Sequence, residues 1–162
     1  MSDTALLVHE MLLARHATLA TAESLTGGRL AVRITDVPGI SATFLGGVVS
    51  YATDLKEELL GVPEAIVYEH GVVSAECAEA MTWGILAATG ATYGLATTGV
   101  AGPEEQEGKP VGTVFLGIGG PTGVRSVPLR LEGGRTAIQD ATCEEALAEL
   151  LSQLQRESGA LR

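Results

Sequence analysis

The chain has 162 residues, which is enough for one domain with a sizeable hydrophobic core. Hydrophobic residues make up 46% of it, which excludes a disordered chain, and the formal net charge of −10 argues against a nucleic-acid-binding surface. Aromatic residues are scarce at 4%, so we expect a core built mainly of Ala, Val, Leu and Ile.

The sequence also predicts where the protein works. No apolar run reaches the length of about 18 residues that a membrane span needs, and the N-terminus lacks the pattern of a signal peptide. Cys77 and Cys143 lie far apart in no metal-ligand spacing, and we predict that both are buried, reduced thiols. We therefore expect a cytoplasmic protein with no membrane and no nucleic-acid partner.

Along the chain, segments with helical periodicity alternate with short apolar segments typical of buried strands. The predicted helices cover residues 4–15, 25–35, 54–60, 63–69, 74–89 and 135–155, and the predicted strands cover 17–23, 43–52, 91–99, 112–120 and 124–131. Ser74 is the expected N-cap of the fifth helix, Pro128 predicts that the last strand lies at a sheet edge, and residues 158–162 are expected to fray. The alternation predicts a single layered α/β domain, residues 1–162, with a mixed sheet.

Polar and glycine-rich segments follow three of the predicted strands. These segments are residues 23–28 (ESLTGG), 50–56 (SYATDLK) and 97–103 (TTGVAGP), the last of which leads into a polar loop and Lys109. In open α/β sheets, ligands bind beyond the carboxyl ends of the strands. We therefore expect the three segments to form one site.

Ser24, in the first of these segments, has two interpretations. It is either the N-cap of the following helix, with Gly27 and Gly28 allowing close packing on the sheet, or a nucleophile near free backbone N–H groups that can stabilise an oxyanion. The segment matches neither the G-x-S-x-G elbow nor the G-x-x-x-x-G-K-[ST] phosphate loop. From the segment by itself, both interpretations stay open.

A nucleophilic serine needs a base, and the sequence offers lysine rather than histidine. His9 and His16 lie in or just after the first predicted helix, and His70 is expected at the surface. The chain has two lysines, Lys56 and Lys109, and both accompany the polar segments. A lysine can lose its proton when it is desolvated, whereas an arginine effectively cannot. The alternative for Lys56 is an ordinary solvated lysine on a helix.

The remaining candidates also have structural alternatives. Tyr51 is either a proton relay or a half-buried strand tyrosine. The glycines of residues 98–102 allow the backbone to approach a ligand closely, or they form a plain turn. Lys109 and Arg135 can balance an anionic ligand, although Arg135 can equally be a surface residue.

Five motifs together resemble the C-terminal domain of the competence/damage-inducible protein CinA. They are TAESLTGG (21–28), SYATDLKEELLGV (50–62), HGVVSAECAEAM (70–81), TTGVAGP (97–103) and KPVGTVFLGI (109–118), and the match extends over about residues 6–154. The resemblance implies a three-layer α/β/α sandwich with a mixed central sheet. Stand-alone members resemble the bacterial nicotinamide-nucleotide amidase, which implies hydrolysis of nicotinamide mononucleotide to nicotinic acid mononucleotide and ammonia. It also implies a homo-oligomer that needs no metal or other cofactor.

The resemblance assigns roles residue by residue. The serine of the family's A-E-S-x-T-G-G motif falls on Ser24, the tyrosine after the second strand on Tyr51, and the lysine of the next short helix on Lys56. In the implied serine–lysine mechanism, neutral Lys56 deprotonates Ser24, Tyr51 assists, and backbone N–H groups around the two glycines or the Gly99 loop hold the oxyanion. The predicted substrate-binding residues are Thr26, Gly27, Gly28, Thr98, Gly99, Ala101, Gly102, Lys109 and Arg135.

The chain departs from the family pattern in two places. The loop after Pro103, EEQEGKPVG, is more acidic than is usual and is expected to repel a phosphate unless its carboxylates face solvent. Gln139 replaces a second arginine in GGRTAIQD. Two other functions stay open: a non-catalytic nucleotide-binding or regulatory module, and an amidase for another pyridine or nucleotide amide.

Overall fold

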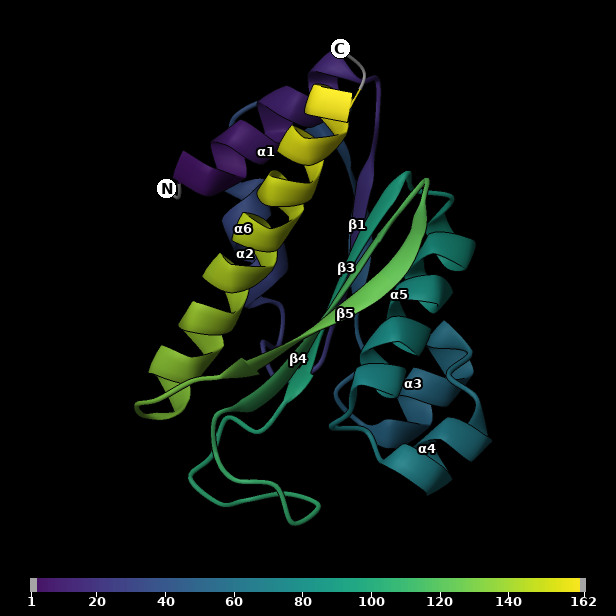
Figure 1. The fold of residues 1–162 in the computed structure, drawn as a ribbon, viewed down its shortest axis with the longest axis vertical. Helices are drawn as coiled ribbons and strands as arrows, with labels where there is room; N and C mark the ends of the chain where they lie inside the picture. Colours follow the sequence, from purple (N-terminus) through teal and green to yellow (C-terminus); the bar gives the residue numbers. More distant parts are fainter. Residues whose placement is uncertain (1–2, 161–162) are drawn as a thin grey trace.

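A computed structural model of the protein describes residues 3–160, and it has a central sheet with helices on both faces (Figure 1). The elements in chain order are α1 (Asp3–Ala14), β1 (Leu19–Glu23), α2 (Arg29–Thr35), the 3-10 helix η1 (Ile40–Ala42), β2 (Phe44–Val49), α3 (Thr53–Leu60), α4 (Glu64–His70), α5 (Ala75–Thr89), β3 (Tyr93–Gly99), β4 (Thr113–Gly120), β5 (Gly123–Arg130) and α6 (Arg135–Ala160). Apart from η1, which the sequence did not predict, these elements agree in type and order with the prediction.

The sheet is mixed, as predicted, and its strand order is β2-β1-β3-β4-β5. Strand β1 is parallel to both β2 and β3, whereas β4 is antiparallel to β3 and to β5. Pro128 lies in β5, which is an edge strand, as its missing N–H predicted. The carboxyl ends of β1, β2 and β3 therefore lie at one edge of the sheet, and the three polar segments follow these ends.

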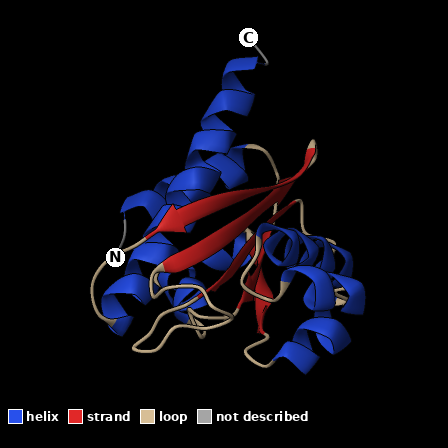
Figure 2. Cartoon of the chain, turned by 60° about the horizontal axis from the view of Figure 1, so that its bottom comes forward, coloured by secondary structure: helices blue, strands red, loops and turns tan. Residues whose placement is uncertain are grey.

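Two hydrophobic cores fill the space between the sheet and its helices. Helices α1, α2 and α6 pack on one face, and α3, α4 and α5 pack on the other, so the sheet is the middle of three layers (Figures 1 and 2). Because side chains alternate along a strand, β1 supplies Leu19 to the first core and Ala20 and Ala22 to the second. The expected α/β/α architecture is confirmed.

The largest differences from the predicted boundaries are at α2 and α6. The predicted helix 25–35 begins only at Arg29, because Gly27 (φ +56°) and Gly28 (φ +100°) adopt left-handed conformations that form a turn first. Helix α6 runs to Ala160 instead of ending at residue 155, and Arg15 donates to Ser158 Oγ at 2.5 Å. The predicted fraying is therefore wrong for residues 158–160, and residues 161–162 lie outside the described part of the chain.

Candidate active site

Glu23, the last residue of strand β1, and Ser24, which follows it, have side chains that point to opposite faces of the sheet. Glu23 turns toward the start of α2, and Ser24, the next residue, turns toward α3, as the alternation of side chains along an extended chain requires. The Ser24 N–H continues the β1–β3 pairing by donating to the Thr97 carbonyl at 3.0 Å. The position of Ser24 is thus fixed by the sheet rather than by a flexible loop.

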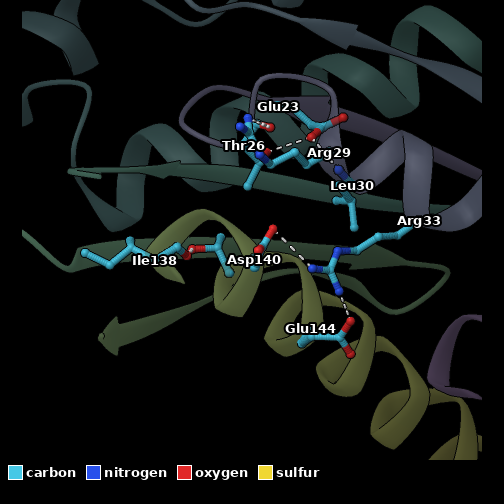
Figure 3. A network of polar contacts seen from close by, with 9 residues as sticks. Glu23, Thr26, Arg29, Leu30, Arg33, Ile138, Asp140 and Glu144 are labelled. Carbon is cyan, nitrogen blue, oxygen red and sulfur yellow. Dashed lines mark hydrogen bonds and ion pairs between the residues drawn. The ribbon is translucent and has the colours of Figure 1, made fainter. Parts of the chain in front are cut away.

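The buried carboxylate of Glu23 organises the turn after Ser24 (Figure 3). It accepts hydrogen bonds from the Thr26 hydroxyl at 2.7 Å and from the N–H groups of Gly28, Leu30 and Ala31 at 3.2, 2.8 and 3.1 Å. A carboxylate in this place satisfies the free N–H groups of the helix and complements its dipole. Glu23, and not Ser24, caps α2, so the N-cap interpretation of Ser24 is wrong.

Helix α6 supports the same turn from the other side. The Gln139 side chain is buried, and its amide donates to the Leu25 carbonyl at 2.8 Å. Arg33 of α2 forms ion pairs with Asp140, at 3.2 Å, and with Glu144 of α6 (Figure 3). Gln139 therefore holds the backbone beside Ser24.

Lys56 lies on the inward face of α3 and reaches Ser24. Its side chain is 1% exposed, so the interpretation as a solvated surface lysine is wrong. Its Nζ atom lies 2.9 Å from Ser24 Oγ, 2.7 Å from the Ser50 carbonyl oxygen and 3.3 Å from the Tyr51 carbonyl oxygen. All of these neighbours come from the carboxyl ends of β1 and β2.

Burial lowers the pKa of Lys56 below its ordinary value of 10.5, and this shift is opposed only in part by the Cys77 thiol, when it is ionised, and by the Glu107 carboxylate. Among the ion pairs of residues 3–160, none joins a carboxylate to Lys56. The amine is therefore desolvated without a counter-ion, and this favours its neutral form.

The side chain of Tyr51 does not approach Lys56. It is 58% exposed, and its hydroxyl accepts a hydrogen bond from Arg135 Nη2 at 2.8 Å. Arg135 Nη1 donates to the Gly102 carbonyl at 2.6 Å. The structure thus joins Tyr51 to Arg135 and the Gly102 loop, while only the backbone oxygen of Tyr51 contacts the lysine.

Two adjoining cavities open beside these residues. The inner cavity, about 120 Å³, is lined by Ser24, Tyr51, Lys56, Thr98, Gly99, Gln106 and neighbours, and the outer cavity, about 300 Å³, is lined by Tyr51, Gly99, Ala101, Gly102, Glu104, Glu105, Gln106 and Arg135, among others. They share Tyr51, Gly99 and Gln106, so a bound molecule can extend from one cavity into the other.

Several predicted binding residues have structural partners instead of lining these cavities. Thr26 is buried and bonds Glu23, and with Gly27 and Gly28 it shapes the turn after Ser24 without lining either cavity. Lys109 donates its side-chain N–H to the Val73 carbonyl.

Glu107 is a site residue that the sequence did not reveal. Its two carboxylate oxygens accept from the N–H groups of Val72 and Val73, at 3.0 and 2.9 Å, so it ties the acidic loop to the wall of the inner cavity. Glu107 lies 35 positions after Val72 and 34 after Val73, so no local sequence pattern predicts these two hydrogen bonds.

The histidines lie elsewhere. His9 is buried with its Nδ1 atom 2.7 Å from Thr43 Oγ1, and His70 lies at the surface near Glu69 and Glu76. In the part of the chain that the structure describes, no three His, Cys, Asp or Glu side chains gather as metal ligands. No helix within residues 3–160 is long and apolar enough to cross a membrane.

Comparisons with known proteins identify the family of the chain. The model of the CinA C-terminal domain matches residues 1–154. The chain belongs to the CinA C-terminal domain family. It is 54% identical over 137 residues to a CinA-like protein of Frankia casuarinae and 45% identical over 140 residues to a putative competence-damage inducible protein of Desulforamulus reducens. These alignments cover 85% and 86% of the chain but only 32% and 34% of those proteins, so the chain spans about a third of their length.

Crystal structures of other CinA proteins share the fold. A CinA superfamily protein from Klebsiella pneumoniae has a TM-score of 0.90 at 32% identity, covering 96% of this chain and 99% of that one. Competence/damage inducible protein CihA from Agrobacterium tumefaciens has a TM-score of 0.87 at 35% identity, with coverage of 96% and 97%. Family membership establishes the fold, and the chemistry has to be inferred from the geometry of the site.

Proposed function

We propose that this CinA-family chain is a serine–lysine amidase that hydrolyses the carboxamide of nicotinamide mononucleotide to nicotinic acid mononucleotide and ammonia. The observation that carries the proposal is the buried Lys56 amine, which lies 2.9 Å from Ser24 Oγ. A serine becomes a nucleophile when an adjacent base can remove its proton. The choice of substrate follows from the resemblance of the motifs to the nicotinamide-nucleotide amidase.

The three contacts of Lys56 suit a neutral amine. Such an amine has two N–H donors and one lone pair. The carbonyls of Ser50 and Tyr51 can accept only, so they take the two N–H bonds, and the lone pair is left to face the hydroxyl of Ser24. In this arrangement the Ser24 hydroxyl donates to the lysine, as proton removal requires.

The Gly99 loop is the better candidate for the oxyanion site. The Gly27 N–H donates to the Ser24 carbonyl, and the Gly28 N–H donates to Glu23, so both are already engaged. In a strand, successive N–H groups point to opposite sides. The backbone of Thr97 bonds Ser24, on the β1 side of β3. Gly99 is two residues further on, so its N–H points to the same side, beyond the end of β1 and toward the inner cavity.

The reaction then takes two steps. Ser24 Oγ attacks the carboxamide carbon while its proton moves to Lys56, and the lysine returns that proton to the leaving nitrogen as the C–N bond breaks and ammonia departs. In the second step Lys56 takes a proton from water, the hydroxide oxygen bonds to the acyl carbon, and the ester bond to Ser24 breaks as Lys56 returns that proton to Ser24 Oγ. A positioned base of this kind contributes about 10²–10⁴-fold to the rate.

Ammonia release from nicotinamide mononucleotide tests the proposal. We expect the parent protein to release ammonia, and Ser24→Ala and Lys56→Ala to lower kcat by at least about 10²-fold. Lys56→Arg is the sharper variant, because arginine is also a long basic side chain but cannot lose its proton to act as a neutral base. Ser41→Ala, which removes an exposed hydroxyl outside both cavities, is the matched control and should keep full activity.

Two outcomes would contradict the proposal. Nucleotide binding without turnover by the parent protein would indicate a non-catalytic nucleotide-binding or regulatory module. Turnover of another amide in a panel of pyridine and nucleotide carboxamides, with none of nicotinamide mononucleotide, would contradict the substrate and keep the Ser24–Lys56 mechanism.

A further inference from the structure

We propose that Glu107 is a positioning residue of the serine–lysine site, and that it acts by fastening the loop between β3 and β4 to the connection between α4 and α5. The inference rests on the proposed function, because it names a further residue on which the same reaction depends. The Glu107 carboxylate bonds the backbone of Val72 and Val73, which line the inner cavity, rather than a reacting group.

The wall of the inner cavity depends on side chains for its hydrogen bonds. Val72 and Val73 are buried in this wall, and their N–H groups donate to the exposed Glu107 at 3.0 and 2.9 Å. The Val72 carbonyl accepts from Thr98 Oγ1 at 2.6 Å, and the Val73 carbonyl accepts from Lys109 Nζ. All four backbone groups therefore bond β3 or the loop that follows it, and both N–H groups depend on Glu107.

The backbone at Glu107 has a conformation that a glutamate rarely adopts. Gln106 and Lys109 exchange backbone N–H to carbonyl bonds of 3.2 and 2.9 Å, so Glu107 and Gly108 form a two-residue hairpin turn. Both have a positive φ, +54° and +71°, as in a type I′ turn, where glycine and asparagine are favoured. A glutamate is strained in this conformation, and the turn by itself gives no reason for it. The contact of its carboxylate with the cavity wall supplies that reason.

Gly71, which precedes the wall, leaves room for the carboxylate. A Cβ atom at this position would lie 2.6 Å from Glu107 Oε2 and 2.7 Å from Oε1, closer than non-bonded atoms can approach. Any other residue at position 71 would therefore displace the carboxylate from the two N–H groups. Both sides of the contact thus have a backbone that accommodates it.

Fastening this wall has two consequences for the reaction. It fixes the surface of the cavity that the carboxamide has to enter, and it keeps Gln106, the residue before Glu107, at the boundary of the inner and outer cavities. It also places a negative charge that raises the pKa of Lys56 against the larger effect of burial. The Cys77 thiol acts on the same amine only when it is ionised, and burial raises its own pKa to about 11.

The variant Glu107→Gly separates the contact from the turn. It removes the carboxylate but suits the positive φ, so it would improve the turn if Glu107 did nothing else. We expect it instead to raise KM for nicotinamide mononucleotide about tenfold with a smaller change in kcat, because the wall holds the substrate and not the reacting atoms. Gly108→Asn is the matched control and should keep the KM of the parent. It alters the same turn, asparagine tolerates this conformation, and the space beside position 108 is open.

The variant Glu107→Gln gives a readout that a merely structural role would not change. It keeps one acceptor oxygen but removes the charge that raises the pKa of Lys56. We therefore expect the midpoint of the profile of kcat/KM against pH to move to lower pH, because the neutral amine forms more easily without a nearby negative charge. Glu10→Gln removes a charge at an exposed position outside both cavities and should leave the midpoint unchanged.

An unchanged KM in Glu107→Gly, or an unmoved midpoint in Glu107→Gln, would overturn the inference. If the parent releases no ammonia, the proposed function fails, and hydrogen exchange at the Val72 and Val73 amides then decides by itself whether Glu107 holds the wall. Loss of protection at both amides in Glu107→Gly, with protection kept in Gly108→Asn, supports the inference. Equal protection in these two variants and the parent overturns it.

Discussion

Burial of the Lys56 amine affects activity and stability through the same protonation equilibrium. Desolvation lowers the pKa of Lys56 below 10.5, and contacts with Ser50 and Tyr51 hold the amine beside Ser24. In the proposed mechanism, the neutral amine is the active form. Burial disfavours the charged form of the amine, so a protonated Lys56 lowers the stability of the folded protein. Both consequences can be measured as functions of pH.

The first prediction concerns the pH dependence of activity. We expect kcat/KM to rise as pH increases and Lys56 loses its proton, with the midpoint below 10.5 because burial lowers this pKa. Steady-state ammonia release at a series of pH values measures the profile. In Lys56→Ala the residual activity should lack this step, and a step retained in that variant would assign it to another group.

The second prediction concerns stability. Between the lowered pKa of Lys56 and 10.5 the folded state binds fewer protons than the unfolded state, so this residue makes the free energy of unfolding increase with pH. Lys56→Met removes the contribution. The stability of Lys56→Met relative to the parent should therefore be most favourable below that pH window and decline through it. Urea unfolding at several pH values measures the difference, and a difference independent of pH would contradict the lowered pKa.

Residue types and strand-end positions marked Ser24 and Lys56 as candidates but left both open, and the resemblance of the motifs to the family assigned them to one site. They could not predict the direction of the Tyr51 hydroxyl or the partner of Lys109. Those contacts depend on side-chain conformations and on residues 84 and 36 positions away, Arg135 and Val73. The role of Gln139 had no local signal for the same reason, because its partner is 114 positions away.

At the scale of elements, the start of α2 connects stability to the position of the nucleophile. The sequence predicted this helix but placed its start four residues early. Serine is a common N-cap residue, so Ser24 suggested a helix starting at residue 25, and Gly27 and Gly28 were taken as part of that helix. The structure uses Glu23 as the acceptor instead, and Gly27 and Gly28 form the turn. A single carboxylate thus caps α2 and fixes the backbone on both sides of the turn.

The third prediction follows from this cap. Glu23→Ala should lower the free energy of unfolding by about 3 kcal/mol, since buried N–H groups lose their acceptor at about 1–3 kcal/mol each, with partial relief from relaxation and water. Glu23→Gln keeps one acceptor oxygen and should be intermediate. Denaturant unfolding measures both, with exposed Glu10→Ala as the control, expected within about 0.5 kcal/mol of the parent. If Glu23→Ala also lowered the free energy of unfolding by no more than about 0.5 kcal/mol, the capping role of Glu23 would be wrong.

At the scale of the whole molecule, one sheet supports two separate hydrophobic cores, and each core contains one cysteine. Cys143 of α6 lies in the first core and Cys77 of α5 lies in the second. Both are buried and unpaired, as the sequence predicted. Burial raises the pKa of Cys77 to about 11 and that of Cys143 to about 12, so both thiols stay protonated and unreactive near neutral pH.

These two thiols test the expectation that the chain is a single cooperative domain. Because β1, β3 and β4 contribute side chains to both cores, neither helical layer can open without exposing the sheet that supports the other. In the single-thiol variants Cys77→Ala and Cys143→Ala, the remaining thiol should therefore become reactive toward a disulfide reagent over the same range of denaturant, coincident with loss of the circular dichroism signal. If one thiol reacted at clearly lower denaturant, its layer would unfold by itself, and the expectation of one cooperative domain would be wrong.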